Sequence, residues 1–230
     1  MGVVGVLALQ GSFNEHIAAL RRLGVKGVEI RKPEQLQTIS SLIIPGGEST
    51  TMAKLAEFHN LFPALPVGQK EGGQELVGGL DCTVHRNYFG SQIQSFEAEL
   101  VVPELASKEG GPETFRGVFI RAPAVLDVGP EVEVLADYPI PSNKVLYSSS
   151  AVEIEEESAV PEKKVIVAVK QGKLLGTAFH PELTADTRWH SYFLKMASDL
   201  GEETSNAVVA VSDAASSSDP QTIYDLPIFR

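Results

Sequence analysis

The sequence contains a single cysteine, Cys82, among its 230 residues. One cysteine can form neither an internal disulfide nor a cysteine-based metal site, and such sparse use is typical of proteins from reducing compartments. The sequence also lacks a run of 18 apolar residues and a charged leader followed by an apolar stretch, so we expect neither a membrane span nor a signal peptide. These absences predict a cytoplasmic protein.

Basic residues are also in short supply, with 19 Lys and Arg against 30 Asp and Glu and a net charge of −11. No basic cluster offsets this balance, which argues against partners such as nucleic acid or an anionic membrane. The length suits one α/β core. We therefore predict a single domain over residues 1–200. Residues 201–230 are rich in Ser, Ala, Asp and Glu, and we expect them to form a disordered acidic tail.

Apolar strands alternate with amphipathic helices in the first part of the chain. Residues 3–9 form an apolar run that is followed by a glycine-containing turn and a helix with one apolar face. The pattern repeats from residue 42, where a glycine turn leads to a helix that Ser49 or Thr50 is expected to cap. This alternation predicts a mostly parallel central sheet with helices on both faces. Residues 164–180 predict a hairpin whose second strand leads to His180.

A histidine and a glutamate are separated by one proline in the stretch GTAFHPELT. Extended backbone would point His180 and Glu182 the same way, so the carboxylate could fix the tautomer of the imidazole and stabilise its protonated form. Such a ring can act as the base for a serine or cysteine nucleophile. The alternative is a plain strand-to-helix loop in which Glu182 starts a helix.

The stretch PGGEST at residues 45–50 joins a buried strand to a helix. Its glycines let the backbone approach a ligand closely, and the N–H groups at a helix start favour negative charge. These properties predict an oxyanion or carboxylate pocket, although a plain helix-capping turn uses the same residue types. A phosphate-binding loop is excluded, because the lysine and the spacing that it requires are absent.

Two arginines, Arg86 and Arg121, each lie inside a compact segment. A guanidinium presents a planar fork that suits a carboxylate, so both could hold an amino-acid substrate, and surface ion pairs are the alternative. None of the remaining histidines has metal-ligand spacing with another, so we predict no metal and assign no site to them. They are His16, His59, His85 and His190.

Five stretches follow one another between residue 3 and about residue 196: VGVLALQGSFNEH, IIPGGESTTM, HRNYFGSQ, GVFIRAP and AFHPELTADTRWH. In this order they resemble the glutaminase subunit of pyridoxal 5′-phosphate synthase, a class I glutamine amidotransferase, and the sequence is plant-like. The resemblance implies a flavodoxin-like α/β fold and the hydrolysis of L-glutamine by a Cys-His-Glu triad. It also implies a partner, a (β/α)₈ synthase subunit that receives the ammonia and builds vitamin B6, and no cofactor bound to this chain.

The resemblance assigns roles residue by residue. His180 and Glu182 match the catalytic base and the carboxylate that orients it. The positions that match glutamine-binding residues of the family are Gly47, Glu48, Ser49, Arg86, Ile120 and Arg121. Among these, Gly47 also matches the donor to the oxyanion.

The family's nucleophilic cysteine has no counterpart in this sequence. The family places it in a G-x-C-x-G turn between a buried strand and a helix, a device that exposes the sulfur. Where that turn is expected, the sequence reads LFPALPVGQKEGG, and no G-x-C-x-G occurs anywhere in the chain. Cys82 aligns with a family position that is not the nucleophile. We therefore predict a fold that lacks one central strand and the helix of that turn, as in a splicing or gene-model variant.

Three interpretations of the function remain open. The first is a glutaminase subunit that is impaired because its nucleophile is absent. The second is a non-catalytic homologue that binds the synthase subunit as a regulatory or structural partner. The third is a hydrolase that uses Cys82 together with His180.

Overall fold

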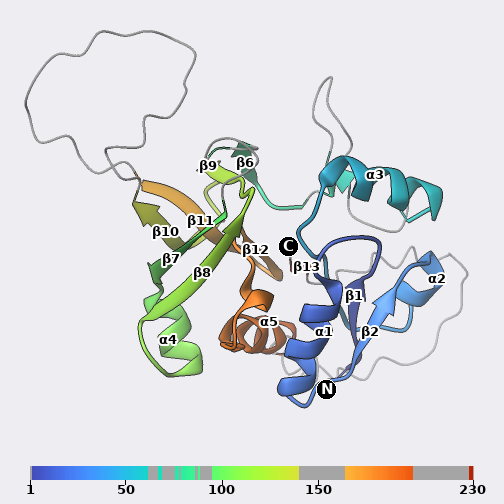
Figure 1. The fold of residues 1–230 in the computed structure, drawn as a ribbon, viewed down its shortest axis with the longest axis horizontal. Coiled ribbons are helices and arrows are strands. Elements are labelled where there is room, and N and C mark those ends of the chain that lie inside the picture. Colours follow the sequence, from blue (N-terminus) through green and yellow to red (C-terminus); the bar gives the residue numbers. More distant parts are fainter. Residues whose placement is uncertain are drawn as a thin grey trace, which may run out of the picture.

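The protein is described here by a computed structural model, shown in Figure 1. The residues that it describes are 2–61, 67–68, 76–77, 79–85, 88, 95–139, 164–198 and 228–229. Within these ranges no helix has both the length and the apolar character needed to cross a membrane.

The N-terminal part of the chain forms the parallel half of the main sheet. Strand β1 (Val4–Leu7) lies between β2 (Gly27–Ile30) and β3 (Ser41–Ile43) and runs parallel to both. The helices that connect and follow these strands are α1 (Phe13–Arg22), α2 (Pro33–Leu36) and α3 (Ser49–Phe58). The predicted alternation of strands and helices is confirmed here.

The second half of the main sheet is antiparallel. Strand β11 (Lys164–Gln171) pairs with β10 (Glu133–Pro139) and with β12 (Leu174–Thr177), and it touches β9 (Ala124–Val128) through a single residue pair. Strand β9 pairs in turn with β6 (Cys82–His85). The predicted hairpin is β11–β12, and its turn includes Gly172 with a φ of +55°, a conformation that favours glycine.

Two shorter sheets and three helical segments complete the described chain. Strands β7 (Ser95–Val101) and β8 (Thr114–Ile120) pair antiparallel, as do β4 (Val67–Gly68) and β5 (Leu76–Val77). The helical segments are α4 (Pro103–Glu109), the 3₁₀ turn η2 (Pro181–Leu183) and α5 (Arg188–Ser198).

A short strand near the C-terminal end lies at the centre of the main sheet. Strand β13 (Ile228–Phe229) sits between β3 and β12 and runs parallel to both. Figure 1 shows it in the middle of the molecule, between the β1 side and the β12 side. Residues 201–227 lie outside the described part of the chain, so the single domain over residues 1–200 and the disordered acidic tail over residues 201–230 stay predictions.

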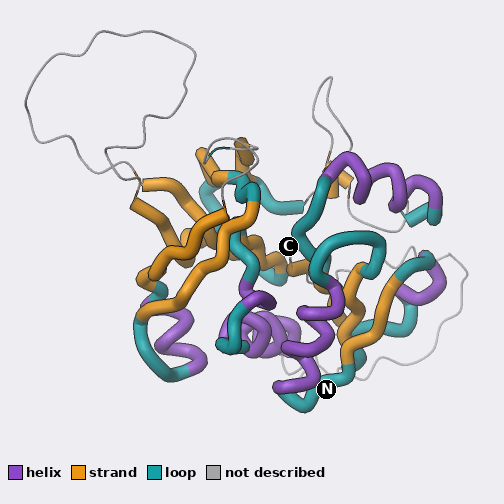
Figure 2. The backbone as a smooth tube through the Cα atoms, in the orientation of Figure 1, coloured by secondary structure: helices purple, strands orange, loops and turns teal. Residues whose placement is uncertain are grey.

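Helices cover both faces of the parallel half. Successive residues of a strand point to opposite faces, and β1 follows this rule: Val4 and Val6 join a core cluster with α1 and α5, whereas Leu7 joins a second cluster with α2 and α3. Figure 2 shows α1 and α5 side by side, and a buried contact between His16 and His190 links them.

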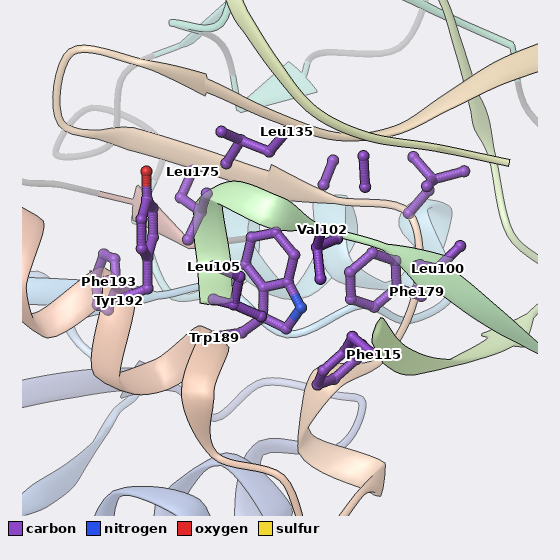
Figure 3. Packing of buried hydrophobic residues seen from close by; sticks show 14 of the residues in the cluster. Leu100, Val102, Leu105, Phe115, Leu135, Leu175, Phe179, Trp189, Tyr192 and Phe193 are labelled. Atoms are coloured by element: carbon purple, nitrogen blue, oxygen red, sulfur yellow. The ribbon is translucent and has the colours of Figure 1, made fainter. Parts of the chain in front are cut away.

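The larger core cluster is built around Trp189 of α5, which is 1% exposed (Figure 3). Its ring packs edge-on against Phe115 of β8, with the centroids 6.1 Å apart, and lies 5.6 Å from Phe179. Each such buried aromatic side chain stabilises the fold by about 1.5–3 kcal/mol. This packing holds the end of the segment that leads to His180.

Candidate functional site

His180 and Glu182 are in direct contact. The segment that follows β12 bends at Ala178 and Phe179, and the 3₁₀ turn η2 begins directly after His180, so Nδ1 of His180 lies 2.7 Å from Oε1 of Glu182. The backbone N–H of His180 donates to the carbonyl of Val118 in β8 at 2.8 Å. This hydrogen bond holds the backbone of His180 against β8. We call His180 and Glu182 the dyad.

The carboxylate of Glu182 is 5% exposed. Burial by itself raises its pKa, but the hydrogen bond from His180 and, in acid, the charge on His16 outweigh burial, and the pKa lies below its usual value. An ionised carboxylate only accepts hydrogen bonds, so Nδ1 of His180 must carry the proton. In the neutral ring this leaves Nε2 unprotonated and able to act as a base.

The glycine turn after β3 faces the dyad. A Cβ atom at Gly46 would lie 3.1 Å from Cε1 of His180, which is tighter than ordinary van der Waals contact, so the turn packs directly against the imidazole. At Gly47 an added Cβ would collide with the side-chain amide of Gln10. Both positions therefore use the small size of glycine to accommodate side chains of the protein itself.

Glu48 caps helix α3 with its side chain. Its carboxylate accepts hydrogen bonds from the backbone N–H groups of Thr50 at 3.0 Å and Thr51 at 2.7 Å. The side-chain hydrogen bond from Thr51, followed by the two backbone bonds, lowers the pKa of Glu48 to about 2. The expectation that Ser49 or Thr50 caps this helix is wrong, because the side chain one residue earlier reaches the free N–H groups.

The backbone of Glu48 is also held from the loop that follows β1. Its N–H donates to Oε1 of Gln10 at 2.9 Å. Ser49 is the first residue of α3, and its side chain is not among those that the structure describes. The end of the turn at Glu48 is thus fixed twice, by the helix cap and by Gln10.

The remaining predicted substrate positions fall at the end of β8 or outside the described residues. Ile120 is the last residue of β8 and is 39% exposed. Arg121 follows it with a φ of +49°, which turns the chain sharply away. They lie two and three residues after Val118, whose carbonyl accepts a hydrogen bond from the backbone N–H of His180. Arg86 lies outside the described part of the chain.

The model of the SNO glutamine amidotransferase family matches residues 6–79 and 66–199 of this chain. The chain belongs to this family.

Curated relatives and a solved structure agree with this assignment. A probable pyridoxal 5′-phosphate synthase subunit PDX2 from Arabidopsis thaliana is 70% identical and aligns over 99% of each chain. The pyridoxal 5′-phosphate synthase subunit PdxT from Pelotomaculum thermopropionicum is 42% identical over 86% of this chain and 97% of its own. A crystal structure of a glutamine amidotransferase matches with a TM-score of 0.65 at 38% identity, over 85% of this chain and 99% of that one. The expected flavodoxin-like α/β fold is thereby confirmed.

The comparisons also show that this SNO amidotransferase is internally shorter than its relative. The alignment with the Arabidopsis protein runs over 253 positions, whereas this chain has 230 residues, a difference of 23. The family model is matched in two parts that meet at residues 66–79, the region in which the sequence analysis placed the missing segment. A segment of about 15–20 residues is enough for one strand and one helix.

Cys82 occupies a different strand from the dyad. It lies on β6 opposite Val128 of β9, and strands β9 and β11 stand between β6 and β12 in the sheet. Neighbouring strands are about 4.8 Å apart, so this order separates the sulfur-bearing strand from the strand that leads to His180. The arrangement does not support the hydrolase that was considered from Cys82 and His180.

Two histidines that the sequence analysis left without a site extend the dyad inward. Nε2 of His16 lies 3.5 Å from Oε2 of Glu182, and its Nδ1 is hydrogen-bonded to Nε2 of His190 at 2.9 Å. Burial lowers the pKa of His16 to about 4 and that of His190 to about 3. Both rings are therefore neutral at pH 7, and His16 contacts Glu182 there as a neutral dipole.

The signal for His16 was present but weak. It stands three and four residues before Ala19 and Leu20, which are fully buried, so helical periodicity places it on the core-facing side of α1. A polar ring on such a face needs a polar partner. Only the folded structure reveals that this partner is Glu182.

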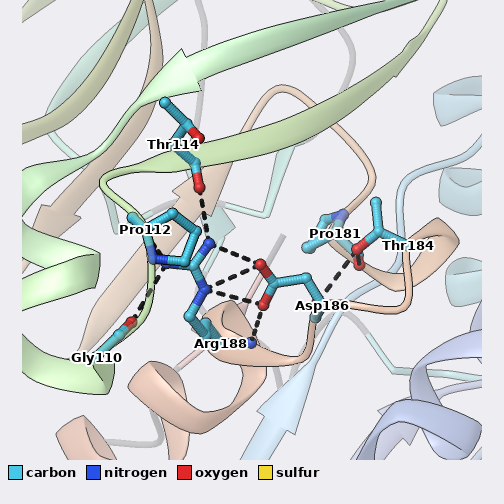
Figure 4. A network of polar contacts seen from close by, with 7 residues as sticks. All are labelled: Gly110, Pro112, Thr114, Pro181, Thr184, Asp186 and Arg188. Atoms are coloured by element: carbon cyan, nitrogen blue, oxygen red, sulfur yellow. Dashed lines mark hydrogen bonds and ion pairs between the residues drawn. The ribbon is translucent and has the colours of Figure 1, made fainter.

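Arg188 fastens the segment that follows the dyad (Figure 4). Its guanidinium donates to the carbonyls of Pro112 at 2.6 Å and Thr114 at 2.8 Å and pairs with the carboxylate of Asp186 at 2.7 Å. The hydroxyl of Thr184 donates to the carbonyl of Asp186 at 3.2 Å. These contacts join the loop before α5 to the start of β8, the strand that also holds His180.

Proposed function

We propose that this chain is a glutaminase-type subunit of pyridoxal 5′-phosphate synthase that acts in vitamin B6 biosynthesis in the cytoplasm. The observation that carries the proposal is the 70% identity to a protein of that name over 99% of both chains. The dyad packed against the Gly46 turn adds support, because it joins a base to a backbone segment of the kind that stabilises an oxyanion. The substrate is L-glutamine, and the partner is the synthase subunit.

The proposed roles follow the chemistry of amide hydrolysis through a thioester. The base, Nε2 of His180, takes the proton of a thiol, and the thiolate attacks the carboxamide carbon of glutamine. The backbone N–H of Gly47 receives the oxyanion, and the C–N bond then breaks as the imidazolium returns the proton to the departing ammonia. Glu182 keeps the ring in the required tautomer. Water hydrolyses the thioester to glutamate.

The remaining residues of the proposed site hold the substrate. We assign this role to residues around the PGGEST turn and to those at the end of β8, together with one arginine outside the described residues. They are Gly47, Glu48, Ser49, Arg86, Ile120 and Arg121. Their arginines supply the planar donors that a carboxylate prefers.

This chain contains the base and the orienting carboxylate but no cysteine in a G-x-C-x-G turn. Without the sulfur no thioester can form, and the groups that remain bind and orient glutamine without an efficient nucleophile. We therefore expect hydrolysis of glutamine to be negligible.

The test is a glutaminase assay of the full chain with the synthase subunit, in which released ammonia and glutamate are measured. The expected result is release no greater than that of a His180→Asn variant. A Cys82→Ala variant serves as the matched control, and its activity should equal that of the unchanged chain. Turnover comparable to that of a relative with the complete triad would contradict the proposal of impaired activity, and dependence on Cys82 would restore the third interpretation.

The absence of the nucleophile favours a second candidate function, that of a non-catalytic partner of the synthase subunit. In this case the chain occupies the positions of active glutaminase subunits and delivers no ammonia. The measurement is gel filtration with the synthase subunit, followed by competition against a catalytically complete subunit. Co-elution with a dose-dependent fall in glutamine-driven product supports this role, and separate elution excludes it.

A further inference from the structure

The strands from β1 to β12 leave one position in the main sheet without a strand. Strand β3 is paired with β1 on one side, and β12 is paired with β11 on one side. Their other edges face each other across a gap of one strand, which β13 fills. This gap lies in the middle of the sheet, between the strand that leads to the Gly46 turn and the strand that leads to His180, and the sequence analysis predicts that one central strand is missing.

An unfilled gap at this position would be costly. All three residues of β3 are buried, and Leu175 of β12 is 0% exposed. Their backbone N–H and C=O groups could not be satisfied by solvent as those of an outer strand are. Each buried polar group left without a partner costs about 1–3 kcal/mol, a large share of the stability of a whole domain.

The pairing of β13 is that of an inserted strand. Ile228 and Phe229 stand opposite Leu42 and Ile43 of β3, and Phe229 also stands opposite Leu175 of β12. The direction is parallel to both neighbours, so β13 continues the parallel half up to the strand of the dyad. A central strand is normally paired in this way on both sides.

The sequence around β13 suits this place. Residues 212–222, SDAASSSDPQT, are small or polar, whereas the stretch IYDLPIFR that begins at Ile223 is richer in apolar and aromatic residues. Ile, Tyr and Phe are favoured in strands. The composition therefore changes where the chain approaches β13, and a purely solvated tail gives no reason for such a change.

We propose that the gap between β3 and β12 is a strand-binding groove, and that this chain fills it with its own C-terminal segment in place of the internal strand that its relatives carry. This is strand addition within one molecule, in which main-chain hydrogen bonds supply affinity and alternate side chains supply specificity. The groove is independent of whether the chain hydrolyses glutamine. Its occupant competes with any internal strand for the same position.

The first test is hydrogen exchange at the backbone N–H groups of β3 and β12 that face β13, followed by mass spectrometry. The full chain is compared with an Ile228→Asp, Phe229→Asp double variant and with a conservative Ile228→Val, Phe229→Tyr control. The double variant should exchange roughly tenfold faster or more at these positions, because the bonds that protect them open. The control should resemble the unchanged chain. Equal exchange in all three proteins overturns the proposal.

The second test uses a peptide, so that it does not depend on the variant folding well. A labelled peptide with the sequence QTIYDLPIFR is added to the double variant and to the unchanged chain, and binding is followed by fluorescence anisotropy. The expected result is saturable binding to the variant and weaker binding to the unchanged chain, whose groove is already filled. Equal binding to both, or binding to neither, contradicts the proposal.

A third measurement establishes which molecule supplies the strand. In a Cys82→Ser background, Ile43→Cys and Phe229→Cys should form a disulfide on mild oxidation, because paired Cα atoms on adjacent strands lie within its usual span of about 4.4–6.8 Å. The control pairs Ile43→Cys with Ser205→Cys. A monomeric cross-linked product is expected. A cross-linked dimer would show that a second copy fills the groove. Cross-linking no greater than in the control would show that β13 does not pair with β3.

Discussion

The two halves of the main sheet are stabilised in different ways. The parallel half, β2-β1-β3, has helices on both faces, and its core consists of aliphatic side chains such as Leu7, Ile30 and Leu42. The antiparallel half carries the dyad and rests on an aromatic cluster around Trp189 and on buried polar contacts. The turn that faces the dyad comes from one half and the dyad from the other, so the candidate site exists only where the halves meet.

This comparison teaches that the two halves tolerate different losses. The strands and helices of the parallel half follow one another along the chain between Val4 and Phe58. The dyad half depends on contacts between residues far apart, such as His16 with Glu182 and Arg188 with Thr114. We expect single substitutions of polar or aromatic residues to cost more in the dyad half.

The largest expected effect is at the centre of the aromatic cluster. Trp189→Ala removes a side chain that is 1% exposed and contacts Phe115 and Phe179. The loss of transfer free energy and the cavity together should lower the free energy of unfolding by about 3–5 kcal/mol. The measurement is urea unfolding, with Phe58→Ala as the control in the parallel half.

Phe58 is 81% exposed, so its replacement should change the free energy of unfolding by less than about 0.5 kcal/mol. A small change in the free energy of unfolding at Trp189, or equal changes at both positions, would contradict the prediction that the buried ring stabilises the fold more than the exposed ring.

The next effect is a dependence of stability on pH that originates where α1 of the parallel half packs against the dyad. Burial lowers the pKa of His16 from 6.5 to about 4, so the unfolded chain binds the proton more readily than the folded chain. This contribution to stability is complete above pH 6.5 and is lost as the pH falls towards 4. The loss should be roughly 3 kcal/mol, and unfolding by urea at a series of pH values measures it.

The matched pair for this measurement is His16→Asn and His85→Asn. His85 is exposed on β6 and serves as the surface control. The His16→Asn variant should lose part of the slope between pH 6.5 and 4, and the rest should remain because burial also lowers the pKa of His190, to about 3. A slope that survives this substitution unaltered would show that other groups cause the acid sensitivity.

The smallest of the three effects compares two arginines. Arg188 is 13% exposed and binds Asp186 and two backbone carbonyls, so Arg188→Ala should lower the free energy of unfolding by about 1.5–3 kcal/mol. Arg31 in the parallel half pairs with Glu29 at 47% exposure, and Arg31→Ala should cost no more than about 1 kcal/mol. Thermal unfolding of both variants measures the difference, and a larger loss at Arg31 would reverse the comparison.

Local patterns in the sequence predicted the elements that flank the candidate site. The apolar run at β1, the glycine turn before α3 and the hairpin β11–β12 all follow from the spacing of apolar residues and from turn residues within a few positions of one another. The short His-Pro-Glu spacing likewise anticipated that His180 and Glu182 could meet, although the structure achieves this with a 3₁₀ turn after His180.

Contacts between distant segments could not be predicted in the same way. The cap of α3 comes from Glu48 because its side chain reaches Thr50 and Thr51, and several residues at such a turn could have done so. His16 looked like an ordinary helical residue, because nothing near it in the sequence indicates Glu182 or His190. The place of β13 depends on two strand edges that lie more than fifty residues from it.

The sequence by itself determined the class of fold, the residue types of the dyad and the absence of a G-x-C-x-G turn, because composition, periodicity and short spacings are properties of neighbouring residues. The tertiary structure alone decided that Gly46 packs on the ring of His180, that two further histidines stand behind Glu182, and that Ile228 and Phe229 complete the central sheet. Buried polar groups and strand edges must find partners wherever the folded chain provides them, and the distance along the sequence does not limit that choice.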